Sequence, residues 1–150
     1  MSSEQEMVDN FNKLWNYSKP EETEKKFREI HTEVKNSGNR SAYLQLQTQL
    51  ARTQGLQMKF DEAHKILDEV EKELDKENIQ LVRIRYLLER GRTFNSSKQK
   101  EKALELFHKA YELGLETGED FFAIDAIHMI GIADNLDDGI KWNEIGIRLA

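Results

Sequence analysis

The side chains best suited to metal binding or proton transfer lie far apart along this chain. It contains four histidines: His31, His64, His108 and His128. They show neither an HExxH spacing nor a second histidine four residues further on, the separation that places two zinc-binding imidazoles on one helix face. We therefore predict no metal site. His128 lies in an apolar segment, and we interpret it structurally as a histidine of a groove or core.

The acidic residues do not form a catalytic set either. The stretch DNLDDG is similar to the start of a calcium loop, but Leu136 replaces an oxygen ligand and Ile145 stands where the bidentate acid belongs. Adjacent acids such as Glu21 and Glu22 suit the start of a helix, where they stabilise the positive end of its dipole. There is no glycine-rich phosphate loop and no nucleophile elbow. We expect a protein that is not an enzyme, with no catalytic residue and no cofactor.

The composition narrows the class of partner. The 150 residues carry 28 acidic and 22 basic side chains, a net charge of −6, and no cysteine. A net negative surface repels nucleic acid, and no run approaches the roughly 18 apolar residues of a membrane span. The polar start MSSEQEMVDN lacks the apolar region of a secretion signal. We expect a cytoplasmic protein that binds neither nucleic acid nor membrane.

The apolar residues recur at the i, i+3, i+4 spacing of amphipathic helices, and one proline with eight glycines favours helices joined by short turns. We predict an all-α protein of eight helices, with Gly38 and Gly118 ending two of them and Asp61 capping the fourth. The charged outer residues of the second helices are interpreted as solvated faces. The helices are expected to form one domain of four pairs, with approximate bounds 4–38, 41–77, 79–117 and 119–150.

The chain nearly repeats itself every forty residues. Small residues stand at Thr23, Ala63 and Ala103, and a large apolar residue follows each after four positions, at Phe27, Leu67 and Phe107. Twelve positions before each lie Phe11, Ala51 and Gly91. A fixed period of this size is typical of stacked helical repeats, which usually bind other proteins.

The segment MKFDEAHKILDEVEKEL resembles the second half of a tetratricopeptide repeat (TPR), through Phe60, Ala63, Leu67 and Val70. The first-helix pattern of that family is partly matched by Leu87, Gly91 and Phe94. The period of forty departs from the usual 34 of the family, and the proline that often ends a unit is missing. The resemblance implies a right-handed α-α superhelix, a TPR-like solenoid of about four antiparallel helix pairs, whose concave face receives a peptide or helix.

Carrying the concave positions of that family over to this chain implies nine partner-binding residues: Gln45, Thr48, Arg52, Arg85, Leu88, Arg92, Asn95, Asp125 and His128. Arg52 and Arg92 are one period apart, and with Arg85 they predict a basic strip. Arginine captures carboxylates through paired hydrogen bonds, which favours an acidic protein or peptide segment as the partner. In the alternative interpretation, these arginines pair with their own neighbours, such as Glu89.

The final segment, DDGIKWNEIGIRLA, predicts an eighth helix without a glycine cap or polar tail. Repeat arrays normally need a polar terminal cap. Three interpretations stay open: a fragment of a longer array, a helix that docks on a partner, or a helix that frays. They lead to two alternative functions, a homo-oligomer assembled through the C-terminal helix and a repeat sensor within a larger regulatory protein.

Overall fold

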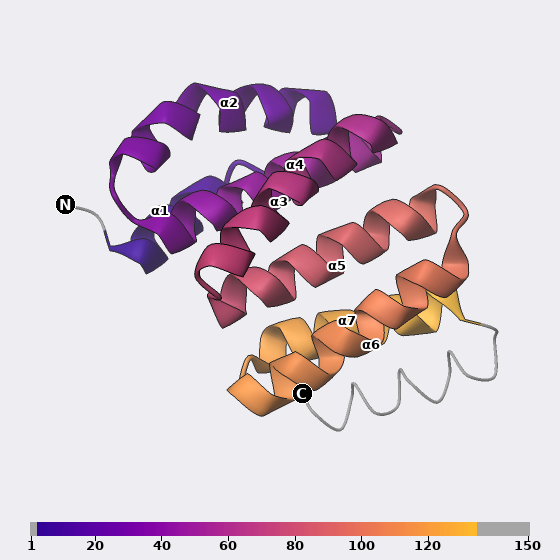
Figure 1. The fold of residues 1–150 in the computed structure, drawn as a ribbon. Helices are drawn as coiled ribbons and strands as arrows, with labels where there is room; N and C mark the ends of the chain where they lie inside the picture. Colours follow the sequence, from indigo (N-terminus) through magenta and orange to yellow (C-terminus); the bar gives the residue numbers. More distant parts are fainter. Residues whose placement is uncertain (1–2, 135–150) are drawn as a thin grey trace. The chain divides into compact units, whose positions relative to one another are not determined.

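The computed structural model describes residues 3–134 of the chain, and all the regular structure in that range is helical (Figure 1). The described helices are α1 (Glu4–Asn12), α2 (Pro20–Asn36), α3 (Arg40–Leu56), α4 (Phe60–Lys76), α5 (Gln80–Ser96), α6 (Lys100–Thr117) and α7 (Asp120–Ala133). The prediction of an all-α fold is confirmed. The predicted eighth helix and the end of the fourth pair lie outside the described residues. The superhelix itself stays a prediction.

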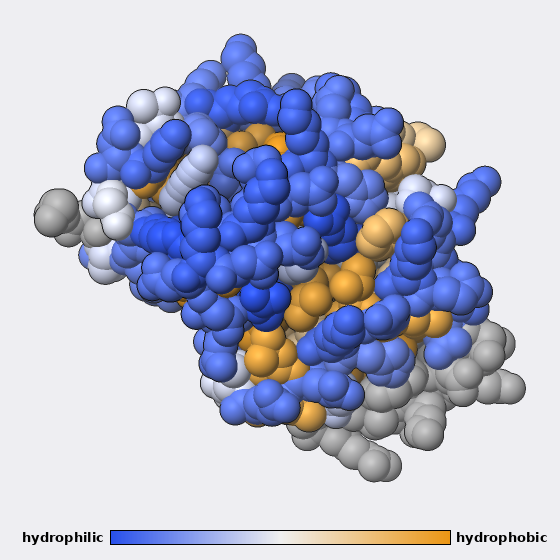
Figure 2. All heavy atoms as spheres, in the orientation of Figure 1, coloured by the Kyte–Doolittle hydropathy of each residue, from blue (hydrophilic) through white to orange (hydrophobic). Residues whose placement is uncertain are grey.

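The chain divides into two compact units, with the boundary between Val82 and Arg83, inside α5. In the first unit α3 is central, because it packs against α1, α2 and α4. Phe11 and Phe27 are fully buried and meet edge to face with their ring centroids 6.2 Å apart. Leu46 and Leu50 of α3 complete this core. The outer side of α2 is hydrophilic, with apolar residues visible only in gaps between its side chains (Figure 2).

In the second unit the helices approach closely where side chains are small. A Cβ atom added to Gly91 of α5 would lie 2.5 Å from Cε1 of Phe107 of α6. A Cβ added to Gly114 of α6 would lie 3.0 Å from the Cβ of Ala123 of α7 and 3.2 Å from its backbone. Glycine at both points therefore lets neighbouring helices pack without displacing each other.

The forty-residue period extends to the backbone of the turns. Met58 and Lys98, one period apart, both have positive φ angles, of 62° and 67°. In each turn the following residue donates its N–H to a carbonyl five residues back, Lys59 to Gln54 at 2.9 Å and Gln99 to Phe94 at 2.8 Å. These bonds are the 6→1 bonds of a Schellman motif, which satisfies carbonyls at a helix end.

Two predicted helix ends are confirmed and one predicted cap is wrong. Gly38 and Gly118 follow α2 and α6 with φ of 79° and 75°, the left-handed conformation expected of them. Asp61, in contrast, does not cap α4: the helix begins at Phe60, the cap position is Lys59, and Asp61 lies in the first turn. Its carboxylate there still favours the positive end of the helix dipole.

The contact of Gly91 with Phe107 gives a stability prediction. Gly91→Ala should lower the free energy of unfolding by about 1–3 kcal/mol, because the added methyl group meets a fully buried ring. One period earlier the chain has Ala51 in place of the glycine and Leu67 in place of the phenylalanine, a larger residue combined with a smaller one. Adding Phe107→Leu should therefore restore much of the loss. Urea unfolding followed by circular dichroism measures both effects, and a double variant less stable than Gly91→Ala would contradict this account.

Candidate functional site

The nine residues predicted to bind a partner are divided between the two units and differ in exposure. Gln45, Thr48 and Arg52 belong to the first unit, and the other six belong to the second. Four of the nine are buried, with 0–7% of their surface exposed: Gln45, Thr48, Arg85 and Leu88. Arg52, Arg92, Asn95 and Asp125 are partly exposed, and His128 is exposed. The structure thus presents five of them to solvent, and their contact with a partner stays a prediction.

The buried polar residues of α3 form hydrogen bonds within the first unit. The amide of Gln45 donates to Oε1 of Glu4, at 3.3 Å, and to the hydroxyl of Ser41, at 3.1 Å. The hydroxyl of Thr48 donates to the carbonyl of Gln45 at 2.6 Å. Buried polar groups need such partners, because leaving one unpaired costs about 1–3 kcal/mol. The bond from Gln45 to Glu4 therefore links α1 to α3, while the bond from Thr48 lies within α3, and both support the surface beside them.

That surface carries a cluster formed by Trp15, Tyr17 and Arg52, which we call the aromatic cluster. The two rings are stacked, with centroids 4.5 Å apart and planes 10° from parallel. The guanidinium carbon of Arg52 lies 5.5 Å from the centroid of Trp15 and 4.9 Å from that of Tyr17. The indole N–H of Trp15 donates to Gln49 of α3 at 3.1 Å. The contacts hold the arginine against the rings by cation–π attraction, while Tyr17 stays 56% exposed.

In the second unit Arg92 connects α5 to α7 through two carboxylates. One guanidinium nitrogen donates to Glu89 at 2.8 Å, and the other lies 2.6 Å from both oxygens of Asp125. The side chain of Glu89 is only 2% exposed. Arg85, also on α5, lies with its guanidinium carbon 5.3 Å from the ring centroid of Phe122. Both arginines therefore interact with side chains of their own unit.

These contacts set the charge of Arg92. Burial by itself lowers the pKa of the guanidinium, but the charges of Glu89 and Asp125 and their hydrogen bonds outweigh burial, so the pKa lies above its ordinary value. One cation facing two carboxylates is not a basic patch. For Arg92 the structure therefore agrees with the alternative interpretation, in which the arginine pairs with neighbours such as Glu89.

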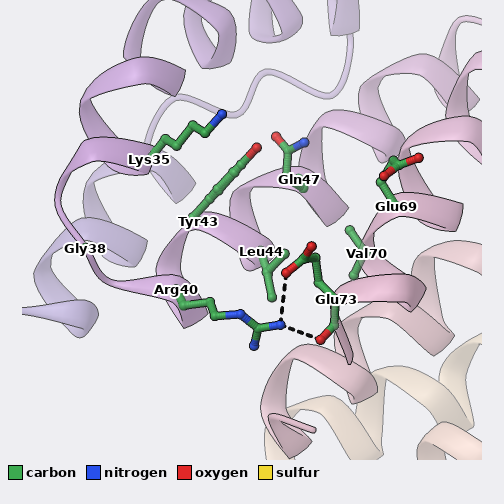
Figure 3. Close-up of a pocket in the computed structure, with 9 residues that line it drawn as sticks. All are labelled: Lys35, Gly38, Arg40, Tyr43, Leu44, Gln47, Glu69, Val70 and Glu73. Atoms are coloured by element: carbon green, nitrogen blue, oxygen red, sulfur yellow. Dashed lines mark hydrogen bonds and ion pairs between the residues drawn. The ribbon is translucent and has the colours of Figure 1, made fainter. Parts of the chain in front are cut away.

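Sequence reasoning missed a second site, a cleft of about 470 Å³ in the first unit between α2, α3 and α4. Lys35 and Gly38 line it from the end of α2 and the turn after it, and Glu69, Val70 and Glu73 from α4 (Figure 3). The α3 wall consists of Arg40, Tyr43, Leu44 and Gln47. Because Lys35 and Glu69 belong to charged outer faces that were interpreted as solvated, no sequence signal brought these residues together. We call this site the α2–α4 cleft.

Arg40 connects two walls of the α2–α4 cleft. Its guanidinium donates to the backbone carbonyl of Glu73 and lies 3.2 Å from the carboxylate of the same residue. Hydrogen bonds from Lys76 and from Arg40 hold the pKa of Glu73 below its ordinary value. Burial, with a smaller contribution from the charge of Glu73, raises the pKa of the Tyr43 hydroxyl above its ordinary value. The hydroxyl of Tyr43 is therefore a proton donor at neutral pH.

The described residues hold no group of three histidine, aspartate or glutamate side chains placed to share a metal ion. None of the helices described for residues 3–134 is both long and apolar enough to cross a membrane.

Comparison of the chain with protein-family models, with curated proteins and with solved structures finds no match. The evidence for a resemblance to tetratricopeptide repeats is therefore the residue pattern of this chain itself.

The ion pairs of Arg92 give a second stability prediction. Arg92→Ala should lower the free energy of unfolding by about 2–3 kcal/mol, because it removes the cation from a carboxylate that is almost fully buried. Arg28→Ala is the matched control: Arg28 pairs with Glu24 on the surface of α2, and its side chain is 54% exposed. That change should cost less than about 1 kcal/mol. Equal losses for the two variants in urea unfolding would contradict a structural role for Arg92.

Proposed function

We propose that this chain is a TPR-like, non-enzymatic scaffold that binds a peptide or helix of a partner protein on the face formed by α3 and the connection between α1 and α2. The observation that carries the proposal is the aromatic cluster of Trp15, Tyr17 and Arg52 beside α3. The few residues that dominate the binding energy of protein interfaces are enriched in tryptophan, tyrosine and arginine. In this cluster all three lie together, and the ring of Tyr17 is more than half exposed.

The rigidity of the aromatic cluster supports this role. Stacking on Trp15 restrains the ring of Tyr17, and the indole of Trp15 is itself tied to Gln49. A surface that is already ordered loses little side-chain entropy when a partner binds. The buried hydrogen bonds of Gln45 and Thr48 maintain α3 underneath. The aromatic cluster is therefore more preorganised for binding than the long charged side chains on the outer side of α2, which would lose more side-chain entropy.

The chemistry of the aromatic cluster favours an acidic peptide. An apolar or aromatic side chain of the peptide would contact the exposed ring of Tyr17, and a carboxylate would meet the guanidinium of Arg52. Arginine binds carboxylates through planar, paired N–H groups. Arg92 is a weaker candidate for this role, because Glu89 and Asp125 already surround its guanidinium.

Peptide selection tests the proposal. Random peptides displayed on phage and selected on the full chain should be enriched in acidic residues beside an apolar or aromatic residue. Synthetic versions of the selected peptides should bind Tyr17→Ala and Arg52→Ala about tenfold or more weakly than the original protein. Arg28→Ala removes an exposed arginine from the outer side of α2 and should leave the affinity unchanged.

Circular dichroism of each variant separates a lost contact from a lost fold. Peptides that bind Tyr17→Ala and Arg52→Ala as tightly as the original protein would exclude the aromatic cluster as the binding surface. Selected peptides without acidic residues would exclude the acidic class of partner.

The second candidate function is self-association, which α7 favours. Phe121 and Ile132 of this helix are 76% and 58% exposed. Large apolar side chains exposed on one helix often mark contact surfaces. The predicted route through the C-terminal helix lies outside the described residues, and α7 is the helix within them that favours self-association.

Sedimentation velocity tests self-association. If α7 mediates it, the chain should sediment as a dimer at micromolar concentrations, and the double variant Phe121→Ser, Ile132→Ser should sediment as a monomer, because the apolar contact is removed. Leu56→Ser, which changes an exposed leucine of α3 in the first unit, is the control and should leave the dimer intact. A monomeric original protein would exclude this function.

A further inference from the structure

The α2–α4 cleft contains three hydrogen-bond donors at one end, contributed by Lys35, Tyr43 and Gln47 (Figure 3). The ammonium group of Lys35 lies 6.0 Å from the ring centroid of Tyr43. Within the described residues, Lys35 forms no ion pair and the hydroxyl of Tyr43 forms no hydrogen bond. The ordinary pKa of a tyrosine hydroxyl, about 10, already lies well above neutral pH and burial raises it further, so this hydroxyl keeps its proton.

His31 fixes the orientation of the third donor. Nε2 of His31 lies 2.8 Å from Oε1 of Gln47, and the imidazole meets the ring of Tyr43 edge to face at 5.2 Å. An amide oxygen only accepts hydrogen bonds, so His31 donates in this contact. The NH₂ group of Gln47 is then left to donate elsewhere, and it has no partner within the described residues. His31 thus positions both neighbouring donors of the cleft.

Three donors, one of them charged, form a suitable site for a carboxylate. Ammonium, hydroxyl and amide groups can each donate one hydrogen bond to its two oxygens, which accept about four in total. The floor of the cleft contains Leu44 and Val70, which are 5% and 1% exposed. These side chains offer an apolar surface for a short hydrocarbon chain.

The opposite wall is acidic. Glu69 and Glu73 of α4 line it, and Glu73 is already engaged by Arg40 and Lys76. Among the residues that the structure describes, Glu69 pairs only with Lys72, at 3.4 Å, and the two side chains are about two-thirds exposed, at 65% and 69%. Such exposed pairs contribute little, so a ligand cation can compete for Glu69. The same acids disfavour a ligand with two negative charges.

We propose that the α2–α4 cleft binds a small zwitterion, a molecule with a carboxylate at one end and an ammonium or guanidinium group at the other. The carboxylate is bound by Lys35, Tyr43 and Gln47, and the cationic end faces Glu69. The volume of the cleft suits a ligand of the size of an amino acid or a dipeptide. The lining balances two cations, Lys35 and Arg40, against two carboxylates. This site is separate from the aromatic cluster and does not depend on the proposed scaffold function.

Titration calorimetry on the full chain with simple probes tests the proposal. Two probes, γ-aminobutyrate and ε-aminocaproate, carry a carboxylate and an ammonium group and differ in the distance between these two charges. Caproate and hexylamine carry one charge each. At least one of the ω-amino acids should bind at millimolar concentrations or below, about tenfold more tightly than either probe with a single charge.

Three variants assign the two ends of the ligand, and a fourth is the control. Tyr43→Phe removes only the hydroxyl and should weaken the better ω-amino acid about fivefold, and Lys35→Met should weaken it about tenfold. Glu69→Gln should weaken that probe without changing the affinity for caproate, because only the cationic end of a ligand faces it. Tyr111→Phe, a tyrosine of α6 in the second unit, is the matched control and should bind like the original protein.

The outcomes are separable from those of the peptide selection. Loss of zwitterion binding in Tyr43→Phe and Lys35→Met, with circular dichroism unchanged, would support the site even if no peptide binds the aromatic cluster. Three results would overturn it: no binding of any probe, caproate or inorganic phosphate binding as tightly as the ω-amino acids, or equal effects of Tyr43→Phe and Tyr111→Phe.

Discussion

Close contact between helices at residues without bulky side chains is the constraint on which this fold depends. Gly91 allows α5 to approach the ring of Phe107, and Gly114 allows α6 to approach the backbone of Ala123. Ala63 and Ala103, which are one period apart from each other, are also fully buried. Because helices of the second unit meet at small residues, the large apolar side chains fill the space around these contacts.

Close packing also determines where polar side chains can lie. Once α5 and α7 approach each other, a charged residue between them needs a partner within the same unit, and Arg92 finds one in Glu89 and another in Asp125. Its guanidinium therefore acts as a structural link. In the first unit the equivalent position, Arg52, lies against the aromatic rings of Trp15 and Tyr17. Arg52 and Arg92, which are one period apart, thus place the same residue type in two different environments.

The central helix α3 presents two different chemistries. Residues two apart on a helix lie about 200° apart around its axis. Gln45 and Gln49 therefore face α1 and the aromatic cluster, whereas Tyr43 and Gln47 face the α2–α4 cleft. The first surface is suited to a peptide with an aromatic or acidic side chain, and the second to a small ligand with both charges. A single helix can serve both sites because its two faces pack against different neighbours.

The sequence by itself determined the helices, because the spacing of apolar residues and the left-handed turns at Gly38 and Gly118 are local properties. It also determined the forty-residue period, which the backbone at Met58 and Lys98 repeats. Only the tertiary structure decided the partners of the charged residues. Asp125 is 33 residues from Arg92, and the α2–α4 cleft joins residues of three helices. Helical periodicity fixes which face a side chain occupies, but which groups it meets there depends on how the helices pack.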